Sequence, residues 1–373
     1  MKTIYFDNAA TSHYKPKCVQ RALIKALKNS ANPGRSGHKL SLINAIEIFN
    51  ARQVVAKHFG MKNAEGVIFT KNCTEAINIA LLGLARNKCH VICSQFDHNA
   101  ILRPLNELKM QNKIDLDIVS GKNKITKNDI EKALKPNTKL VCIGAMSNVT
   151  GYENDIEEIG LLCHEKGILL LVDDAQGAGH TKIDMTKSHI DYLAFSGHKG
   201  FLAPQGIGAL CINTPITPCP TICGGTGTDS YSLNQPKYLP ESLESGTLAT
   251  PLILSLKAGI EYVERHFDKS NKKLQALTLY LHDKLKNIKG IKIYSWPENK
   301  VGIASFTIKG FDSAKVCDYL DNKYNIATRG GLHCAPLTHE YYHTLKEGMV
   351  RVSMSSKNTK RQINRLIYAL MQL

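Results

Sequence analysis

The stretch Leu169-Leu170-Leu171-Val172-Asp173-Asp174-Ala175-Gln176 is an apolar run that ends in two adjacent carboxylates. Short apolar runs of this kind are typical of strands buried on both faces, as in a parallel sheet. In open α/β sheets, ligands bind beyond the carboxyl ends of the strands. The two acids therefore mark a candidate site, although a pair of solvated carboxylates after a strand explains this segment equally well.

Similar apolar runs recur from about residue 65 to residue 215, separated by amphipathic stretches. This alternation is typical of βα units that build a mostly parallel sheet. The predicted strands are 67–70, 90–93, 115–119, 140–145, 168–172, 192–195 and 208–212, with helices such as 74–85 and 155–166 between them.

The rest of the chain predicts a second, smaller α+β domain. Residues 214–240 are rich in Pro, Gly, Thr and Ser, which is typical of a long ordered loop. Thr250 as a cap and Pro251 at the first helical position indicate the start of a helix. A strand at 301–308, a helix at 313–322 and a strand at 349–353 follow. We expect a large domain of residues 12–262 and a small domain formed by residues 1–11 and 263–373.

Composition excludes several classes of protein. The chain has 373 residues, of which 43% are hydrophobic and 21% charged, and none of its apolar runs approaches the roughly 18 residues of a membrane helix. The net charge of +16 favours anionic substrates or acidic partners, but acids are interspersed and nucleic-acid-binding motifs are missing. Eleven scattered cysteines and an early charge at Asp7 indicate a reducing cytoplasm rather than export. We expect neither a membrane nor a nucleic-acid partner.

Two further segments add chemistry to the carboxylates. Lys199, in Ser196-Gly197-His198-Lys199, follows a predicted strand and suits amine chemistry if its pKa is lowered, although a lone loop lysine is more often a solvated charge. Thr74 lies at the start of a predicted helix, where free amides bind phosphate, or where it serves as an ordinary N-cap. Pyridoxal phosphate requires a carboxylate for its ring nitrogen, a lysine that forms a Schiff base, and hydrogen-bond donors for its phosphate.

The sequence resembles the class V aminotransferase family of pyridoxal phosphate enzymes, and within it the cysteine desulfurase and selenocysteine lyase branch. The resemblance implies a type I transferase fold, with a mostly parallel seven-stranded sheet in the large domain and a smaller α+β domain. Nine motifs carry it in the family's order: Tyr5-Phe6-Asp7-Asn8-Ala9-Ala10-Thr11, Gly34-Arg35-Ser36-Gly37-His38, Thr74-Glu75-Ala76-Ile77-Asn78, Asp97-His98, Ser147-Asn148-Val149-Thr150-Gly151, Val172-Asp173-Asp174-Ala175-Gln176, Ser196-Gly197-His198-Lys199, Glu244-Ser245-Gly246-Thr247 and Arg329-Gly330-Gly331-Leu332-His333-Cys334-Ala335.

The resemblance implies a role for each cofactor-binding residue. Lys199 would be the Schiff-base lysine and would then move the Cα proton of the substrate. Asp173 would hold the pyridinium, Gln176 would bond the phenolic oxygen and His98 would stack on the ring. The remaining cofactor-binding residues would be Asn148 near the ring oxygen, Cys73, and the phosphate contacts Thr74, Ser196 and His198, with Thr247 reaching across from a second subunit of a homodimer.

Cys334 is the residue that separates a desulfurase from an aminotransferase. Its setting resembles the Arg-x-Gly-x-His-Cys-Ala form of the Suf-like group, in which a thiolate beside His333 and Arg329 is the nucleophile. A buried, inert cysteine is the alternative. Arg351 matches the family's clamp for the substrate carboxylate, unless it is a solvated arginine at a strand edge. Arg329, Asn148, His38 and Asn8 are further expected substrate contacts, with Arg35 in a secondary role.

The implied reaction converts L-cysteine to L-alanine and leaves a persulfide on Cys334, from which an acceptor protein takes the sulfur. Three alternatives stay open: a selenocysteine lyase, a transaminase, β-lyase or epimerase that needs no thiol, and a sulfur-relay partner with slow turnover. Asn99, Cys73 and Asp174 depart from the family's usual residues. The spacings Cys89 to Cys93 and Cys219 to Cys223 lack the paired set of a zinc site, so we expect no metal.

Overall fold

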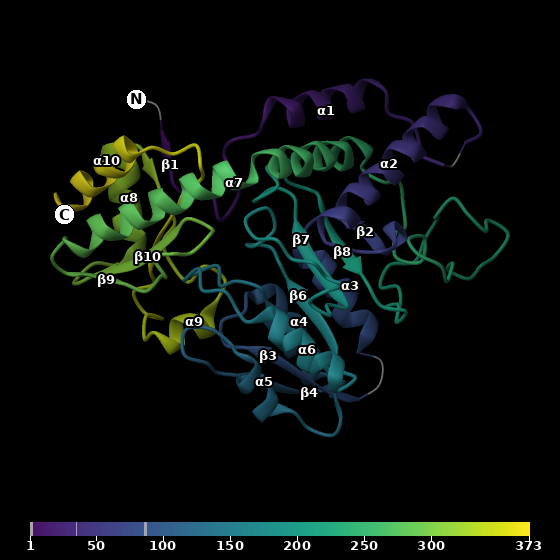
Figure 1. Cartoon of the computed structure of the whole chain (residues 1–373), viewed down its shortest axis with the longest axis horizontal. Coiled ribbons are helices and arrows are strands. Elements are labelled where there is room, and N and C mark those ends of the chain that lie inside the picture. Colours follow the sequence, from purple (N-terminus) through teal and green to yellow (C-terminus); the bar gives the residue numbers. More distant parts are fainter. Residues whose placement is uncertain (1–2, 35, 86–87) are drawn as a thin grey trace.

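The structure, a computed structural model, describes residues 3–34, 36–85 and 88–373. These residues form two units, each with its own sheet and apolar core (Figure 1). Among the described residues, no helix combines the length and apolarity needed to cross a membrane.

The larger unit contains a seven-stranded sheet in the order β2-β8-β7-β6-β5-β3-β4. Only β8 runs antiparallel to its neighbours, so the predicted mostly parallel sheet is confirmed. The strands are β2 (Val67–Thr70), β3 (Cys89–Ser94), β4 (Ile114–Val119), β5 (Thr138–Gly144), β6 (Leu169–Asp173), β7 (Tyr192–Ser196) and β8 (Gly208–Ile212).

Helices cover both faces of this sheet, because alternate strand residues feed two separate apolar clusters. Val67 and Phe69 of β2 belong to one cluster, and Ile68 belongs to the other. The helices of this unit are α1 (Lys17–Lys28), α2 (Lys39–His58), α3 (Cys73–Leu84), α4 (Asn99–Met110), α5 (Lys127–Ala133) and α6 (Ile156–Glu165), with a short 3-10 helix η1 (Ala64–Gly66) before β2.

The smaller unit is the predicted α+β part. It has an antiparallel sheet in the order β12-β10-β9 and a separate parallel pair of β1 with β11. Its elements are β1 (Ile4–Tyr5), β9 (Ile291–Ile293), β10 (Ile303–Ile308), α8 (Ser313–Tyr324), β11 (Ile326–Ala327), α9 (Pro336–Tyr341), β12 (Val350–Ser353) and α10 (Lys360–Leu370).

A single helix, α7 (Thr250–Lys286), connects the two units. It contributes Ile253 and Leu256 to a core of the larger unit and Leu274 to the core of the smaller one. The helix is capped by Ala249, so the expectation that Thr250 is the cap is wrong, and Thr250 is the first helical residue. The expected division at residues 262 and 263 falls inside α7 and stays a prediction. Residues 214–240 form neither helix nor strand, as predicted for a long loop.

Candidate active site

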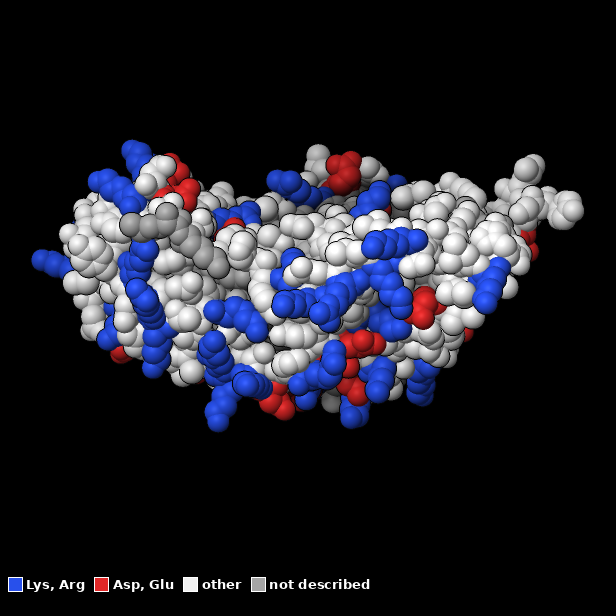
Figure 2. Space-filling view, turned by 90° about the horizontal axis from the view of Figure 1, so that it is seen from above, with Lys and Arg blue, Asp and Glu red and all other residues white. Residues whose placement is uncertain are grey.

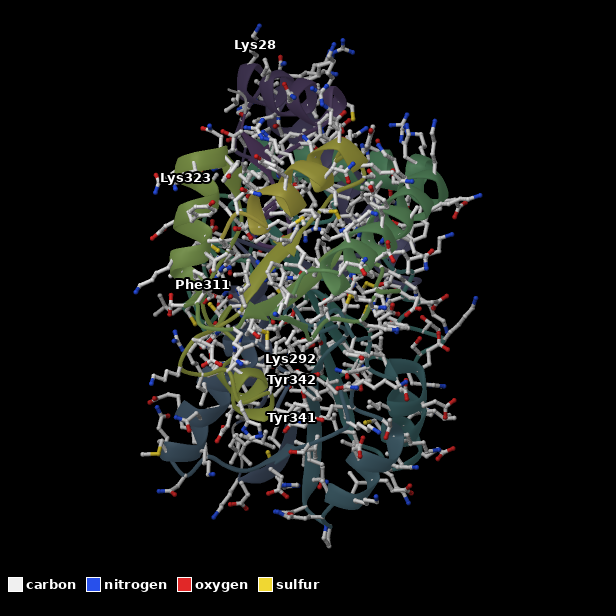
Figure 3. The ribbon with its side chains drawn as sticks, turned by 90° about the vertical axis from the view of Figure 1, so that its left-hand side faces the viewer. Lys28, Lys292, Phe311, Lys323, Tyr341 and Tyr342 are labelled. Atoms are coloured by element: carbon white, nitrogen blue, oxygen red, sulfur yellow. The ribbon has the colours of Figure 1, made fainter. Side chains whose placement is uncertain are left out.

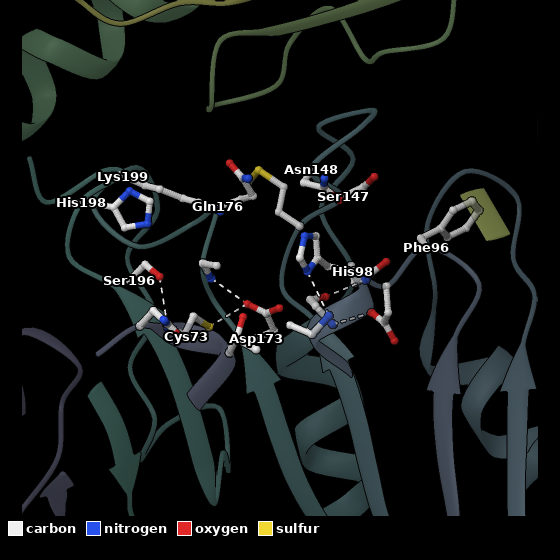
Figure 4. Close-up of a pocket in the computed structure, with 18 residues that line it drawn as sticks. Cys73, Phe96, His98, Ser147, Asn148, Asp173, Gln176, Ser196, His198 and Lys199 are labelled. Atoms are coloured by element: carbon white, nitrogen blue, oxygen red, sulfur yellow. Dashed lines mark hydrogen bonds between the residues drawn. The ribbon is translucent and has the colours of Figure 1, made fainter. Parts of the chain in front are cut away.

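A cavity of about 270 Å³ opens at the carboxyl ends of β5, β6 and β7 (Figure 4). This is the edge of the sheet at which the sequence predicts a ligand. Of the predicted residues, the cavity lining includes Cys73, Thr74, His98, Asn148, Asp173, Gln176, Ser196, His198 and Lys199. Segments separated by more than a hundred residues therefore supply one site.

Asp173 is the last residue of β6, and its side chain is held in one orientation. Its Oδ1 atom accepts hydrogen bonds from the Cys73 thiol at 3.2 Å and from the Ala175 amide at 2.9 Å. Burial raises the pKa of Cys73 well above its ordinary value, and the charge of Asp173 raises it further. The thiol therefore stays protonated and can donate to the carboxylate.

Lys199 lies on the turn that follows β7. Its ammonium is removed from water, so burial lowers the pKa of Lys199, while the charge of Asp173 opposes this shift. A lowered pKa makes the neutral amine more available as a nucleophile. Ser196, the last residue of β7, accepts at its Oγ a hydrogen bond from the Cys73 amide at 3.1 Å. The end of β7 and the start of α3 are therefore joined at the cavity.

The start of α3 differs from the expectation in one respect. Asn72, not Thr74, is the N-cap, and its Oδ1 accepts a hydrogen bond from the Glu75 amide at 2.9 Å. The capping alternative for Thr74 is therefore wrong. Thr74 lies in the exposed first turn and lines the cavity. A helix N-terminus with a free hydroxyl suits phosphate.

His98 is the N-cap of α4, and its ring borders the cavity. Its Nδ1 atom accepts a hydrogen bond from the Ala100 amide at 3.0 Å. Burial lowers the pKa of His98 to about 4, so the ring is neutral near pH 7. Because Nδ1 accepts, the proton is on Nε2.

The side-chain NH₂ groups of Gln176 and Asn148 each donate a hydrogen bond to the backbone of another segment. Gln176 Nε2 donates to the carbonyl of Ala9 at 3.1 Å. Asn148 Nδ2 donates to the carbonyl of His333 at 2.8 Å, while its buried Oδ1 has no hydrogen-bond partner among the described residues. An unsatisfied buried oxygen in a cavity wall calls for a donor from a ligand.

The loop carrying Cys334 lies against the cavity wall. The Asn99 amide donates to the carbonyl of Cys334 at 2.7 Å, next to the bond from Asn148 to His333. His333 and Cys334 have left-handed backbone conformations, with φ of 50° and 58°. Cys334 is exposed, which excludes the alternative of a buried cysteine. Arg329 Nη2 lies 3.8 Å from its sulfur.

His333 contributes less to the thiol than expected. Its ring is buried, and Nε2 donates to the carbonyl of Met349 at 3.0 Å. Burial lowers the pKa of His333 well below its ordinary value, and nearby Arg351 lowers it further. The imidazole is therefore neutral, whereas Arg329 places a positive charge beside Cys334.

Arg351 is buried within the protein, at 1% exposure, so the alternative of a solvated arginine is wrong. Its Nη2 pairs with Asp7 at 3.1 Å, and its Nη1 donates to the carbonyl of Asn148 at 3.0 Å. Its Nε has no partner among the described residues. Asp7 belongs to the N-terminal motif, but sequence reasoning gave it no role.

The remaining predicted residues lie outside the cavity lining. Arg329 and Arg351 are joined to each other by two backbone hydrogen bonds. Asn8 donates through Nδ2 to the carbonyl of Ser353 at 3.0 Å. His38 is exposed and caps α2, and Thr247 is exposed after the long loop. Arg35 lies outside the described residues.

Sequence reasoning also gave no role to Asp97, which lines the cavity beside His98. Its two oxygens accept hydrogen bonds from the amides of Ser94 at 2.7 Å and Gly144 at 2.8 Å. Burial raises the pKa of Asp97 to about 7. The side chain joins the end of β3 to the end of β5. Its position directly before His98 was the available signal.

The residues around the cavity fit pyridoxal phosphate. The carboxylate of Asp173 suits a pyridine nitrogen, and the amine of Lys199 suits an aldehyde. Hydroxyls from Thr74 and Ser196 beside the start of α3 suit a phosphate. The cavity volume of about 270 Å³ lies just below the range of about 300–1,000 Å³ for pockets of small organic ligands.

Comparisons with known proteins show which family the chain belongs to. Probable cysteine desulfurases from Methanothermobacter thermautotrophicus and Pyrococcus abyssi are each 33% identical to the chain; the matches cover 97% and 100% of the chain, and 92% and 94% of the relatives. The apo structure of a cysteine desulfurase from Thermococcus onnurineus matches with a TM-score of 0.90 and 31% identity, over 99% of this chain and 94% of that one. The model of the class-V aminotransferase family matches residues 4–366. The chain belongs to the class-V aminotransferase family.

Proposed function

We propose that the chain is a pyridoxal phosphate-dependent cysteine desulfurase, which converts L-cysteine to L-alanine and retains the sulfur as a persulfide on Cys334. The observation that carries the proposal is the attachment of the Cys334 loop to the cavity wall. Asn99 and Asn148 bind the carbonyls of Cys334 and His333, and this brings an exposed thiol to the site that contains Lys199. An aminotransferase has no use for a thiol there.

Pyridoxal phosphate, when bound, supplies an electron sink for charge developing at Cα of the substrate. Asp173, oriented by Cys73 and Ala175, would hold the pyridine nitrogen, and Lys199 would hold the aldehyde carbon. Thr74, Ser196 and His198 would hold the phosphate. Burial lowers the pKa of His198 to about 4, so His198 would act there as a neutral donor.

Lys199 takes the Cα proton of the bound substrate through its neutral amine. Arg351 binds the substrate carboxylate, and Asp7 holds the guanidinium in place. The Cys334 thiolate attacks the substrate sulfur. A sulfur–sulfur bond forms, and the Cβ–sulfur bond breaks with its electron pair remaining on carbon. Protonation of that carbon, followed by return of the proton from Lys199 to Cα, gives alanine. An acceptor protein then removes the sulfur from Cys334.

We also propose a homodimer in which Thr247 of each chain reaches the phosphate of the other. Thr247 is exposed and outside the cavity of its own chain, as this arrangement requires. The helix α2 exposes Leu42, Ile43, Ile46 and Phe49 on one side, by 43% to 60%. An apolar helix face of this size favours contact with a second copy.

The test is alanine formation from L-cysteine by the wild type and by Cys334→Ala. We expect the variant to retain visible cofactor absorbance and to lose alanine formation by about a hundredfold or more, because the nucleophile is absent. Cys223→Ala is the matched control, since Cys223 is the other exposed cysteine of the described chain. Full turnover by Cys334→Ala would contradict the proposal. Activity kept only on selenocysteine would assign a lyase activity to the same site.

A further inference from the structure

A second, larger cleft of about 830 Å³ lies between the N-terminal segment, α7 and the loop after β12. Four cationic side chains line it: Lys15, Lys17, Arg265 and Lys357. No Asp or Glu occurs among the described residues that line it. The cleft therefore has a strongly positive lining without internal compensation.

These four cations lack carboxylate partners within the described part of the chain. Arg265 Nε donates instead to the backbone carbonyl of Glu261 at 3.0 Å. Lys357 donates to the hydroxyl of Tyr262 at 3.4 Å and lies over the ring of Tyr14 at 4.6 Å. Neutral partners position these groups but leave their charge available to an anion.

Lys15 is the least exposed of the four. Its ammonium donates to Ser12 Oγ at 2.6 Å and to the carbonyl of His198 at 3.1 Å. Burial lowers the pKa of Lys15 to about 8. A half-buried ammonium without a counterion is costly, and an anion in the cleft would reduce this cost.

The positive charge continues from the cleft along α1. Its residues Lys17, Arg21, Lys25 and Lys28 are all exposed, and their spacing places them on one side of the helix. The row covers about 16 Å of helix. In Figure 2, which views the molecule from above, Lys and Arg outnumber Asp and Glu, with some Asp and Glu between them. Figure 3 labels Lys28 at the end of α1. We call the cleft and this row together the basic track.

We propose that the basic track binds an acidic segment of a partner protein. The track extends beyond the cleft, so a small anion would leave the α1 row unused, whereas an extended peptide of about five residues covers it.

A single-stranded nucleic acid fits the track less well. It would need free aromatic faces on which bases could stack. Tyr5 is stacked on His13 at 4.9 Å and Tyr262 on His266 at 4.2 Å, and Lys357 covers Tyr14. One face of each ring is therefore already occupied. The proposal concerns a surface outside the active-site cavity and does not depend on the proposed reaction.

The probe is a fluorescein-labelled octaglutamate peptide, titrated into the full-length holoenzyme and followed by fluorescence anisotropy. We expect Arg265→Glu with Lys357→Glu to weaken binding by about tenfold or more at low salt, because two attractive charges become repulsive. Arg265→Gln with Lys357→Gln should give a smaller loss. Raising the salt from about 50 mM to about 300 mM should weaken binding to the wild type.

The matched control is Lys109→Glu with Lys113→Glu, which changes net charge equally at the exposed end of α4. It should change the affinity by less than about threefold. Unchanged melting temperature and alanine formation in the Arg265 and Lys357 variants exclude misfolding. The proposal is overturned if those variants bind like the wild type, if the control loses as much affinity, or if an octauridylate RNA binds the track more tightly than the peptide.

Discussion

Asp173 receives two donors before any ligand is present, one of them the thiol of Cys73. The thiol is a weaker donor than a hydroxyl. Its role is therefore to orient the carboxylate.

Cys73→Ala should weaken pyridoxal phosphate binding by about three- to tenfold, because one bond that orients Asp173 is lost. Cys73→Ser should keep most of the affinity. Titration of the apoenzyme with the cofactor, followed by visible absorbance, gives the dissociation constants. Equal binding by Cys73→Ala and the wild type would remove the orienting role.

Asp97 predicts a specific pH dependence of stability. Its pKa is about 7 in the folded protein, against about 3.9 in an unfolded chain. Between these values the folded state keeps a proton that the unfolded state releases. The stability that Asp97 contributes is complete below about pH 4 and is lost as the pH rises to about 7.

Asp97→Asn cannot titrate, so it should gain stability relative to the wild type as the pH rises through this range, by at most about 1.4 kcal/mol per pH unit. Thermal melting at several pH values measures the difference. Asp268→Asn, in an exposed part of α7, serves as control. A wild-type-to-variant difference that does not change with pH would contradict the prediction.

At the scale of elements, α9 positions the loop that precedes it. Tyr341 packs edge-on against Phe96 at 5.3 Å, and Thr338 donates to the carbonyl of Gln95 at 3.3 Å, both beside the start of α4. The next residue, Tyr342, packs on Tyr294 of the smaller unit at 5.4 Å. Figure 3 labels Tyr341, Tyr342 and Lys292 in this region. The helix therefore connects the Cys334 loop to both units.

Tyr341→Ala should lower the rate of alanine formation by about tenfold while the cofactor stays bound, because a loosened α9 no longer holds Cys334 at the cavity. Tyr368→Ala, on the exposed side of α10, is the control. The two rates and the cofactor absorbance are measured together. Loss of the cofactor in Tyr341→Ala would mean that the helix supports the whole cavity rather than the loop.

At the scale of the whole molecule, the proposed dimer makes the most direct prediction. Ile46→Glu with Phe49→Glu places charges on the apolar side of α2 and should convert dimers to monomers in sedimentation velocity. Met110→Glu with Leu161→Glu adds the same charge at exposed apolar residues of α4 and α6 and should leave dimers intact. A wild type that sediments as a monomer would refute the shared site.

Much of the architecture was predictable because strand ends leave a clear pattern. The seven apolar runs became the seven strands, and the acid at the end of β6 and the lysine after β7 meet at one cavity. The features that the sequence did not predict depend on contacts in three dimensions. The neutral state of His333, the pairing of Arg351 with Asp7 and the cap at Asn72 each follow from contacts with atoms that the local pattern does not specify.

The backbone at His333 and Cys334 limits how far sulfur can travel. Two consecutive left-handed residues cost about 1–3 kcal/mol each, and their carbonyls are bonded to Asn148 and Asn99. Movement of the whole Cys334 loop would have to break both hydrogen bonds. The thiol therefore moves by rotation of the Cys334 side chain. An acceptor must therefore insert its receiving group at the mouth of the cavity. Sulfur transfer then depends on the shape of the acceptor and not on movement of the Cys334 loop.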